Sequence, residues 1–584
     1  MSKTSHVMHL VSHTHWDREW RLPWQEHRMK LVDCIDNVIR LMDEYPEFKH
    51  FQLDGQTSVI EDYLEVRPEM AKRIGELVKN KKLLIGPWYT LVDESLIHGE
   101  SIVRNLLLGH EIAGRFGNVM RVGFGISSFG HISQLPQIFS QLGINNVIFS
   151  RGISDWQVKS EFIWESPDGT RVLALHLPDH YTKSNWFYVI HRPAFVGIGP
   201  FEWDYQWGKI GQPAHACDMA GIHRCYSLLE PQLQYDPKSI TKQIEQLRDE
   251  AAEVATTQHL LFLDGVDHIE ANPLLGKYLR ESKNLINNDT LVHTTLPDYI
   301  EAIEKAIDRN KLEVIGGEMR RPSRDGVHNQ LLGHVMSARI HLKQRNQICQ
   351  TLLTKIAEPF ATIAWLNGAE YPRSLFGIAW RHLCQNHAHD SICGCSVDQV
   401  HQDMIYRFDQ AEIIAEELTQ RAFCYLIPRI DYSSLKDNEI ALTLFNPLPY
   451  TRSEAVKLAI DIPTTLKATG FQLRDACGEE LPYQIVEESD AVNQIIQPLN
   501  AHQDIDVHRY ITYVPVEGIP ALGHTTLVLK HERKSGKGPV GSLTPQTNVL
   551  ENENLRVKIN PNGTLDITDK TQQRTYTGLH YFED

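Results

Sequence analysis

The sequence predicts a multidomain α/β protein in which an α/β domain comes first, a helical bundle second and a β-sandwich region last. Short apolar strands alternate with amphipathic helices from residue 6 to about 310, and apolar residues then recur at helical spacing to residue 426. After Ser433, short alternating segments are separated by Pro, Gly and Asn, which is typical of a sandwich. We therefore expect domains at 1–315, 316–430, 431–540 and 541–584.

Six short apolar strands in the first 270 residues are each followed by polar or charged residues of types that occur in catalytic and binding sites. The strands are Val7–Ser12, Phe51–Leu53, Leu83–Ile85, Val122–Ile126, Val147–Ser150 and Leu260–Leu263. Helical stretches at 26–43, 60–79 and 239–253 provide the crossovers that parallel strands need. Because the carboxyl ends of parallel strands share one rim, we expect the residues that follow these strands to line one cleft.

The rest of the chain is divided by its periodicity. Helical spacing at 331–356, 376–384 and 397–426 predicts three helices packed as a bundle. The aromatic, Gly- and Pro-rich stretch 186–235 is interpreted as a long loop over the rim. The tail, with Leu555–Ile559 and Leu565–Ile567, is interpreted as the first hairpin of a further β-domain, with too few strands for an independent sheet.

The composition narrows the class of protein. The net charge of −16, from 58 basic and 74 acidic residues, argues against a nucleic acid or an anionic membrane as the partner. The start lacks the pattern of a signal peptide, and no apolar run approaches the length of a membrane span. Nine scattered cysteines indicate reduced thiols. We expect a cytoplasmic protein that binds a small ligand, and homo-oligomerisation stays open.

Two histidine clusters suggest a metal site. His15 and Asp17 lie two residues apart, so on an extended segment both side chains point the same way; a polar turn explains the pattern equally well. His389 lies in the bundle region, and a histidine from a distant segment would complete a ligand set suited to zinc. Three cysteines flank His389, but their spacing is uncommon for a separate structural zinc site, and packed thiols are the favoured interpretation; they are Cys384, Cys393 and Cys395.

Other residues at the strand ends suit sugar chemistry. Asp267 ends an apolar strand, where partial burial would raise its pKa and let it donate a proton; an ordinary turn is the alternative. Aromatic platforms for a sugar ring could come from Trp20, Trp88 and Tyr89, although most tryptophans fill cores. Arg151 could bind an anion or orient a carboxylate, and a surface salt bridge is equally compatible with the sequence.

Seven motifs in one order resemble those of the glycoside hydrolase family 38 α-mannosidases, with the bacterial branch that includes mannosylglycerate hydrolases most similar. They are His13-Thr14-His15-Trp16-Asp17-Arg18-Glu19-Trp20, Asp54-Gly55-Gln56-Thr57, Gly86-Pro87-Trp88-Tyr89, Ser128-Phe129-Gly130-His131, Gly265-Val266-Asp267-His268, Gly317-Glu318-Met319-Arg320 and His387-Ala388-His389-Asp390. The resemblance implies a seven-stranded α/β-barrel-like domain, a three-helix bundle, β-domains and one zinc ion in the cleft.

Site roles follow from the resemblance residue by residue. The zinc ligands are matched by His15, Asp17 and His389. Trp20 matches the residue that stacks on mannose, Asp267 the acid/base, and Arg151 an arginine near the nucleophile.

One position departs from the family pattern Asp-x-Phe-Gly. Here Ser127 stands where the family's Asp is both nucleophile and fourth zinc ligand. A retaining glycosidase needs that carboxylate to form the glycosyl-enzyme, and a neutral serine oxygen is a poorer metal ligand. The family's β region also continues beyond residue 584, so we expect a carboxyl-terminally truncated relative with weakened zinc binding and turnover.

The leading hypothesis is an α-mannosidase-type retaining glycoside hydrolase by descent, acting on α-mannosides such as mannosylglycerate or oligomannosides. We expect little or no hydrolysis of an aryl α-mannoside. The alternatives are a relative that binds mannosides without turnover, and a hydrolase in which a metal-activated water attacks with inversion. A metal-dependent sugar deacetylase ranks last, because it explains neither His389 nor the β tail.

Overall fold

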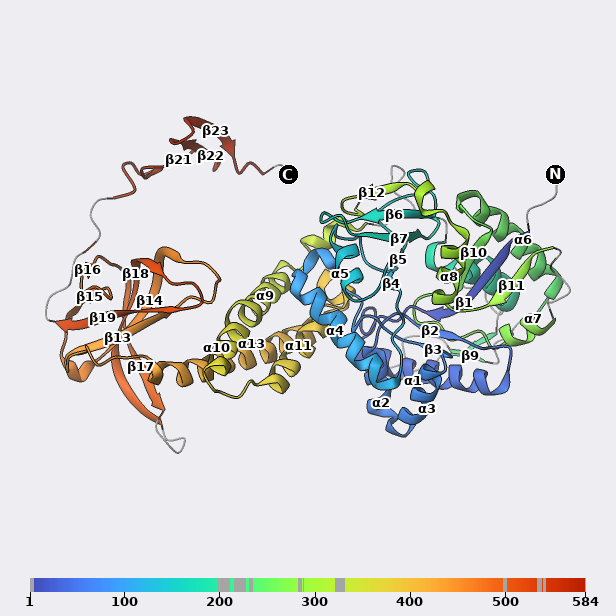
Figure 1. Ribbon diagram of the computed structural model, residues 1–584, viewed down its shortest axis with the longest axis horizontal. Helices are drawn as coiled ribbons and strands as arrows, with labels where there is room; N and C mark the ends of the chain where they lie inside the picture. The colour runs from blue at the N-terminus through green and yellow to red at the C-terminus, as the bar shows by residue number, and fades with distance from the viewer. Residues whose placement is uncertain are drawn as a thin grey trace. The chain divides into compact units, whose positions relative to one another are not determined.

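The computed structural model describes residues 5–179, 181–197, 199, 211–214, 227–229, 235–281, 286, 288–320, 331–496, 502–532, 538 and 542–582. The chain divides into two compact units, Met1–Phe423 and Cys424–Asp584. The first contains the α/β region and nearly all of the helical region, and the second contains the β region (Figure 1).

Strand β1 (Val7–Thr14) is the centre of the first sheet. It pairs in parallel with β10 (His259–Asp264), β11 (Thr290–His293) and β2 (Phe51–Leu53), and β2 pairs with β3 (Leu83–Leu84). All residues of β1 after Val7 are buried, as expected for a parallel strand covered on both faces. The carboxyl ends of β1 and β10 therefore lie at one edge, where the predicted site residues begin.

The second sheet has the strand order β12-β6-β7-β5-β4. The strands β4 (Gly123–Gly125), β5 (Asn146–Phe149) and β7 (Arg171–His176) pair in parallel, β6 (Glu161–Glu165) is antiparallel to β7, and β12 (Val314–Gly316) is parallel to β6. The strands in the described part of this region form two five-stranded sheets and one two-stranded pair. The α/β architecture is present, and a closed seven-stranded barrel is not confirmed.

The three predicted crossover helices are present, one of them with a break, and further helices join the other strands. The predicted helix at 60–79 is split into α2 (Ser58–Val66) and α3 (Ala71–Lys79), because Pro68 disfavours a helical conformation at the preceding residue. The other crossover helices are α1 (Trp24–Glu44), α4 (Gly99–Phe116), α5 (Leu135–Gln141), α6 (Pro237–Val254), α7 (Leu275–Glu281) and α8 (Leu296–Ala306).

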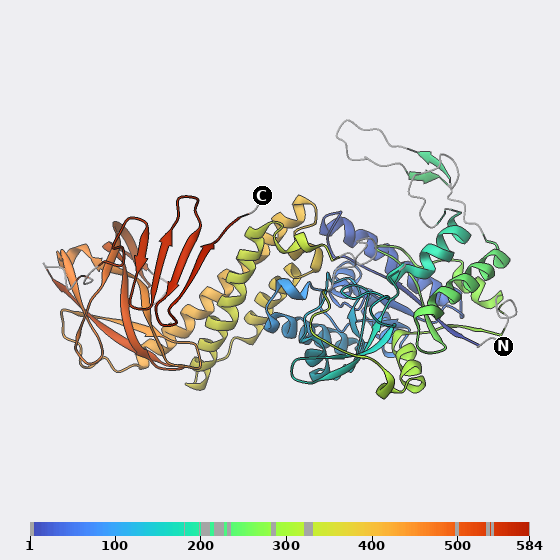
Figure 2. The same ribbon diagram turned by 90° about the horizontal axis from the view of Figure 1, so that it is seen from above.

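The helices after the α/β region lie side by side in both views (Figures 1 and 2). They are α9 (Ile340–Thr351), η8 (Leu352–Ala357), α10 (Glu358–Leu366), α11 (Arg373–Asn386), α12 (His389–Cys393) and α13 (Asp398–Leu426). The first three follow one another without a gap, so three long helical segments result, as the apolar spacing predicts. Leu342, Leu383 and Phe408 are fully buried in their shared apolar cluster.

The stretch 186–235 is not simply a long loop, since its first part is the helical segment η4 (Phe187–Val196). Apolar side chains of η4, such as Val189, Ile190 and Phe195, are buried in the core of the unit. The strands β8 (Gln212–Ala214) and β9 (Ser227–Leu229) form a small antiparallel pair. Residues 198, 200–210, 215–226 and 230–234 lie outside the described residues.

The second unit contains a β-sandwich. One sheet is β13 (Glu439–Phe445), β19 (His524–Glu532), β15 (Gly470–Arg474) and β16 (Glu480–Leu481), and the other is β14 (Arg452–Pro463), β18 (His502–Ile519) and β17 (Gln484–Ile496). Buried side chains from both sheets, including Phe471, Leu529, Ile460 and Val514, share one apolar core.

The tail forms a sheet of its own, so the expectation of too few strands was wrong. The strands β20 (Val549–Glu551), β21 (Leu555–Ile559), β22 (Leu565–Asp569) and β23 (Arg574–Leu579) pair consecutively as an antiparallel meander. The remaining short helical turns are η1 (Pro68–Met70), η2 (Glu94–Leu96), η3 (Thr182–Ser184), η6 (Arg309–Lys311), η7 (Gly333–Met336), η9 (Ile427–Arg429) and η10 (Thr464–Leu466).

Candidate active site

The first part of the site lies just past the ends of β1 and β10. His15 and Asp267 form a parallel bridge that extends the pairing of these strands. The His15 amide donates to the Val266 carbonyl at 3.3 Å, and the His268 amide donates to the His15 carbonyl at 2.8 Å. The two segments are thus held in fixed register, with the predicted ligand beside the predicted acid/base.

His389 reaches the same place from the helical region. It is the first residue of α12, and its amide donates to the Leu91 carbonyl at 2.9 Å. A bridge between Val92 and Ala388 holds the two segments together. A residue from a distant part of the sequence is therefore fixed beside the end of β1 by backbone hydrogen bonds.

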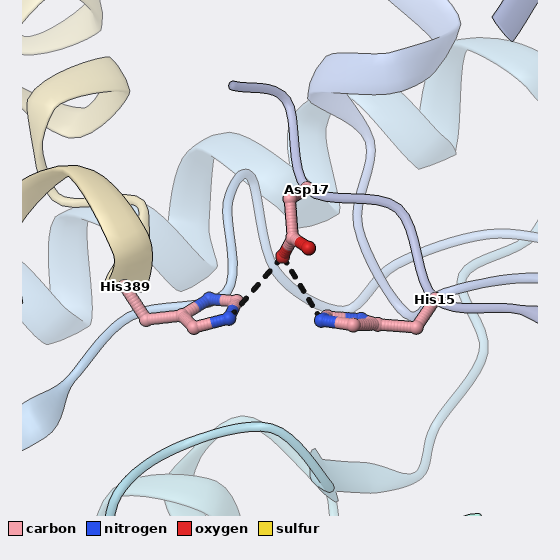
Figure 3. Close-up of side chains that lie close together, drawn as sticks. All are labelled: His15, Asp17 and His389. Atoms are coloured by element: carbon pink, nitrogen blue, oxygen red, sulfur yellow. Dashed lines mark ion pairs between the residues drawn. The ribbon is translucent and has the colours of Figure 1, made fainter. Parts of the chain in front are cut away.

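The three predicted metal ligands meet around one carboxylate oxygen. Asp17 Oδ1 lies 2.9 Å from His15 Nε2 and 3.3 Å from His389 Nε2. Figure 3 shows the two imidazoles pointing at the same oxygen from opposite sides. All three side chains are buried, and their donor atoms lie within 4.8 Å of one another.

The surroundings of this cluster fit a divalent cation. His15 Nδ1 lies 2.9 Å from both oxygens of Asp54, and His389 Nδ1 lies 3.2 Å from the Leu91 carbonyl, so each ring presents Nε2 to the centre. Metal-binding histidines commonly donate their other N–H to such an acceptor. Within the described residues, buried Asp17 Oδ1 accepts no hydrogen bond of good geometry. Two imidazoles and a carboxylate are a donor set suited to zinc.

The electrostatics of the cluster also favour a bound cation. Burial lowers the pKa of His15, but the carboxylates of Asp17 and Asp54 outweigh it and raise the pKa to about 10. Burial raises the pKa of Asp17, but the neighbouring His15 outweighs this effect. The pKa of Asp17 therefore lies well below its usual range. The negative charge that holds this proton can hold a metal ion in its place, with release of the proton.

A lysine that sequence reasoning missed lies between the two catalytic positions. Lys183 Nζ is 2.7 Å from Asp267 Oδ1 and donates to Ser127 Oγ at 3.4 Å. Burial of Asp267 raises its pKa, but Lys183 and His15 outweigh this effect and lower the pKa to about 2. The expectation of a raised pKa for Asp267 was therefore wrong in this structure, because no sequence pattern indicates the neighbouring ammonium group.

Ser127 lies beside the cluster, where the resemblance places it. It follows β4 by two residues, is buried, and its Oγ is 3.3 Å from His15 Nδ1. Arg151 Nη1 donates to the Ser127 carbonyl at 2.7 Å, and its guanidinium lies 4.8 Å from the centre of the Phe129 ring. Arg151 thus positions the backbone of Ser127, and burial lowers its pKa.

The predicted aromatic platforms differ in exposure. Trp20 is half-buried, with the Arg21 guanidinium 4.2 Å from its ring centre and His268 6.2 Å away between ring centroids. Trp88 and Tyr89 are each 1% exposed. The Trp88 indole donates to the Phe124 carbonyl at 2.7 Å, so its ring is a core residue without a free face. Of these three residues, only Trp20 keeps part of its side chain exposed.

Two of the three flanking cysteines are packed thiols, and the third, Cys395, is exposed. Cys384 and Cys393 are buried, and Cys393 Sγ donates to Asp93 at 3.4 Å. Cys395 Sγ donates to Asp390 at 3.1 Å. Within the described residues, the clusters with metal-ligand spacing contain no cysteine.

Comparison with known proteins agrees with this geometry. Residues 5–320 match the model of the glycosyl hydrolases family 38 N-terminal domain, and residues 332–426 match the alpha mannosidase middle domain. A Halalkalibacterium halodurans protein named "Putative mannosylglycerate hydrolase" is 30% identical, covering 100% of this chain and 63% of its own length. The mouse protein "Alpha-mannosidase 2C1" is 22% identical, covering 78% of this chain and 38% of its own.

A solved structure is also similar over nearly the whole chain. The crystal structure of an alpha-mannosidase from Enterococcus faecalis V583 aligns with a TM-score of 0.84 and 31% identity, covering 98% of this chain and 62% of that one. The fold is that of a multidomain glycoside hydrolase, and His15, Asp17 and His389 form a candidate metal centre within it. The chain belongs to glycoside hydrolase family 38, and it spans about three fifths of the length of these two bacterial relatives.

Proposed function

We propose that this chain is a zinc-dependent, α-mannoside-recognising member of family 38 in which retaining hydrolysis is strongly reduced. The observation that carries the proposal is the arrangement of an intact three-ligand cluster beside Ser127 and the Lys183–Asp267 ion pair. The cluster supports metal and sugar binding, whereas the two neighbouring positions lack the pair of carboxyl groups that retention needs.

The metal would be held by His15, Asp17 and His389. Catalytic zinc sites commonly use three protein ligands, so the loss of a fourth at Ser127 weakens binding without abolishing it. When bound there, zinc supplies Lewis acidity toward sugar hydroxyls.

The protein residues account for recognition and for the slow chemistry. The half-buried face of Trp20 suits the C–H face of a mannose ring. Asp267 is the only carboxyl group of the family's catalytic pair that remains, and the Lys183 ammonium favours its ionised form. An ionised carboxylate cannot protonate a leaving oxygen, and Ser127 cannot form a carboxylic ester with the sugar.

The substrate class follows from the family and its named relatives. We infer an α-mannoside such as mannosylglycerate or an oligomannoside as the small-molecule partner, and a cytoplasmic location. Among the described residues, no helix is both long and apolar enough to cross a bilayer. The net charge of −16 disfavours a nucleic-acid partner.

Calorimetry and product analysis on the full chain test the proposal. Zinc-loaded protein should bind mannose saturably, binding should be lost after chelation, and release of an aryl α-mannoside leaving group should stay near background. Fast zinc-dependent release would contradict the proposed loss of turnover, and absence of sugar binding would contradict recognition. If slow hydrolysis occurs, NMR of the first-released anomer distinguishes retention from inversion. Inversion would favour direct attack by a metal-activated water.

A further inference from the structure

We propose a second divalent-cation site, formed by Asp155, His176 and Asp179, on the loops that follow β5 and β7. His176 is the last residue of β7, and Asp179 follows it by three positions. Asp155 lies six residues after the end of β5, whose last residue, Phe149, pairs with His176. Parallel strand ends thus bring the three side chains together.

The two carboxylates are oriented by the backbone. The Asp155 amide donates to Asp179 Oδ2 at 3.2 Å, and the Asp179 amide donates to Asp155 Oδ2 at 2.8 Å. This reciprocal pair uses one oxygen of each carboxylate and leaves Oδ1 of each directed toward His176. The distances are 3.2 Å from Asp155 Oδ1 to Nδ1 and 3.8 Å from Asp179 Oδ1 to Nε2.

His176 is a buried polar side chain without a hydrogen-bond partner. Its side chain is 0% exposed, and neither ring nitrogen makes a hydrogen bond of good geometry with any described residue. Asp155 Oδ1 and Asp179 Oδ1 are likewise buried and unpaired by this criterion. Burying a polar atom without a hydrogen-bond partner is unfavourable, so several such atoms around one point indicate a missing partner.

A protonated His176 does not account for these atoms. An imidazolium between two carboxylates satisfies them only when its N–H bonds point at the oxygens, and the observed directions do not meet that requirement. In the described part of the chain, neither carboxylate pairs with a lysine or arginine.

The donor chemistry selects the class of ion. The site offers two carboxylate oxygens and one imidazole nitrogen, all within 4.8 Å of one another. Carboxylates suit magnesium and manganese, whereas imidazole suits zinc and other first-row metals, so the mixed set favours zinc or manganese over calcium. Both aspartates are partly exposed, with side-chain exposures of 22% and 15%, whereas the two Oδ1 atoms that face His176 are buried.

An ion here would connect two loops of the first site. Arg151, which holds the Ser127 carbonyl, precedes Asp155 by four residues, and Lys183 follows Asp179 by four. A cation bound by both loops would limit the motion of the backbone next to Arg151 and Lys183. These two basic side chains would then be held more firmly beside the first cluster. The second site is therefore a positioning element and supplies no group to the reaction.

Metal counting on the full chain tests the proposal. After chelation and equilibrium dialysis against zinc, mass spectrometry should find two zinc ions per folded chain. His389→Ala should leave one, and adding Asp155→Asn and Asp179→Asn in that background should leave none. The Asn replacements keep side-chain size and an oxygen acceptor for the amides, so they avoid the folding risk of truncating buried His176. The same double Asn variant should lose the tight manganese signal in an electron paramagnetic resonance titration.

The chain provides a matched control. His508 also lies between two carboxylates, at 2.9 Å from Asp490 and 3.6 Å from Glu488. Its side chain is 35% exposed, and it does not fall in a described cluster with metal-ligand spacing. Asp490→Asn should leave the zinc count unchanged. The proposal is overturned if His389→Ala binds no zinc, or if the ion it retains persists after both Asn replacements.

Discussion

Replacing Asp54 with Asn should weaken zinc binding although Asp54 is not a metal ligand. Asp54 accepts from His15 Nδ1 at 2.9 Å, from the Trp16 amide at 2.8 Å and from Gln56 Nε2 at 2.7 Å. An Asn side chain offers one oxygen for these three donors and no charge to keep His15 Nε2 directed at the centre. Loss of such an outer carboxylate typically costs 10–100-fold in metal affinity, about 1.4–2.7 kcal/mol.

Competition with a chromophoric chelator measures this change, and Glu94→Gln is its matched control. Glu94 accepts from His131 Nδ1 at 2.9 Å and from the Ile132 amide at 3.0 Å, and both side chains of the Glu94–His131 pair are fully buried. Both substitutions should lower thermal stability, but only Asp54→Asn should raise the zinc Kd. The reasoning fails if Asp54→Asn leaves the Kd within threefold of the wild type, or if Glu94→Gln raises it equally.

Three further predictions concern the first site. His389→Ala should lower zinc affinity at this site by at least 100-fold and abolish mannose binding, as measured by calorimetry with a zinc count; unchanged sugar affinity would contradict the shared centre. Ser127→Asp should raise zinc affinity and should raise the rate of leaving-group release from an aryl α-mannoside by about 100-fold or more, because it restores a carboxylate beside His15. A rate that stays at background would show that more than this carboxylate is lost. Trp20→Ala should weaken mannose binding with little change in melting temperature. Trp88→Phe should destabilise the fold by about 1–3 kcal/mol and leave the sugar affinity of the folded protein unchanged, because Trp88 is a core residue. The opposite pattern would make Trp88 the platform.

The sequence is sufficient to predict the features of the fold and site that depend on where strands end and on the spacing of apolar residues. Because parallel strands end at one edge, the strand ends alone place His15 and Asp267 on one rim. The structure adds that their strands are neighbours, so that the two residues form a bridge. The family resemblance adds His389, which periodicity alone could not bring to the same point. The long helices after residue 331 also lie close to the segments that apolar spacing predicts.

The sequence is insufficient to predict the pKa or the burial of a side chain when these depend on a neighbour from another segment. Lys183 belongs to no motif, so its effect on the pKa of Asp267 could not be foreseen. Trp88 follows a strand as a platform residue would, but packing against the next strand buries it. The segment η4 (Phe187–Val196) resembles a loop in sequence because its Pro193 and aromatic residues hide the apolar face that enters the core.

The bridge between His15 and Asp267 makes this protein more sensitive to insertions than to many substitutions. Side chains alternate between the two faces of an extended chain, so a single residue added within β10 would turn Asp267 away from His15 and Lys183 while leaving every residue type intact. Family members with all the motifs but with a changed length between β10 and Asp267 should therefore be inactive. Spacing in this segment is then a better guide to function than residue identity alone.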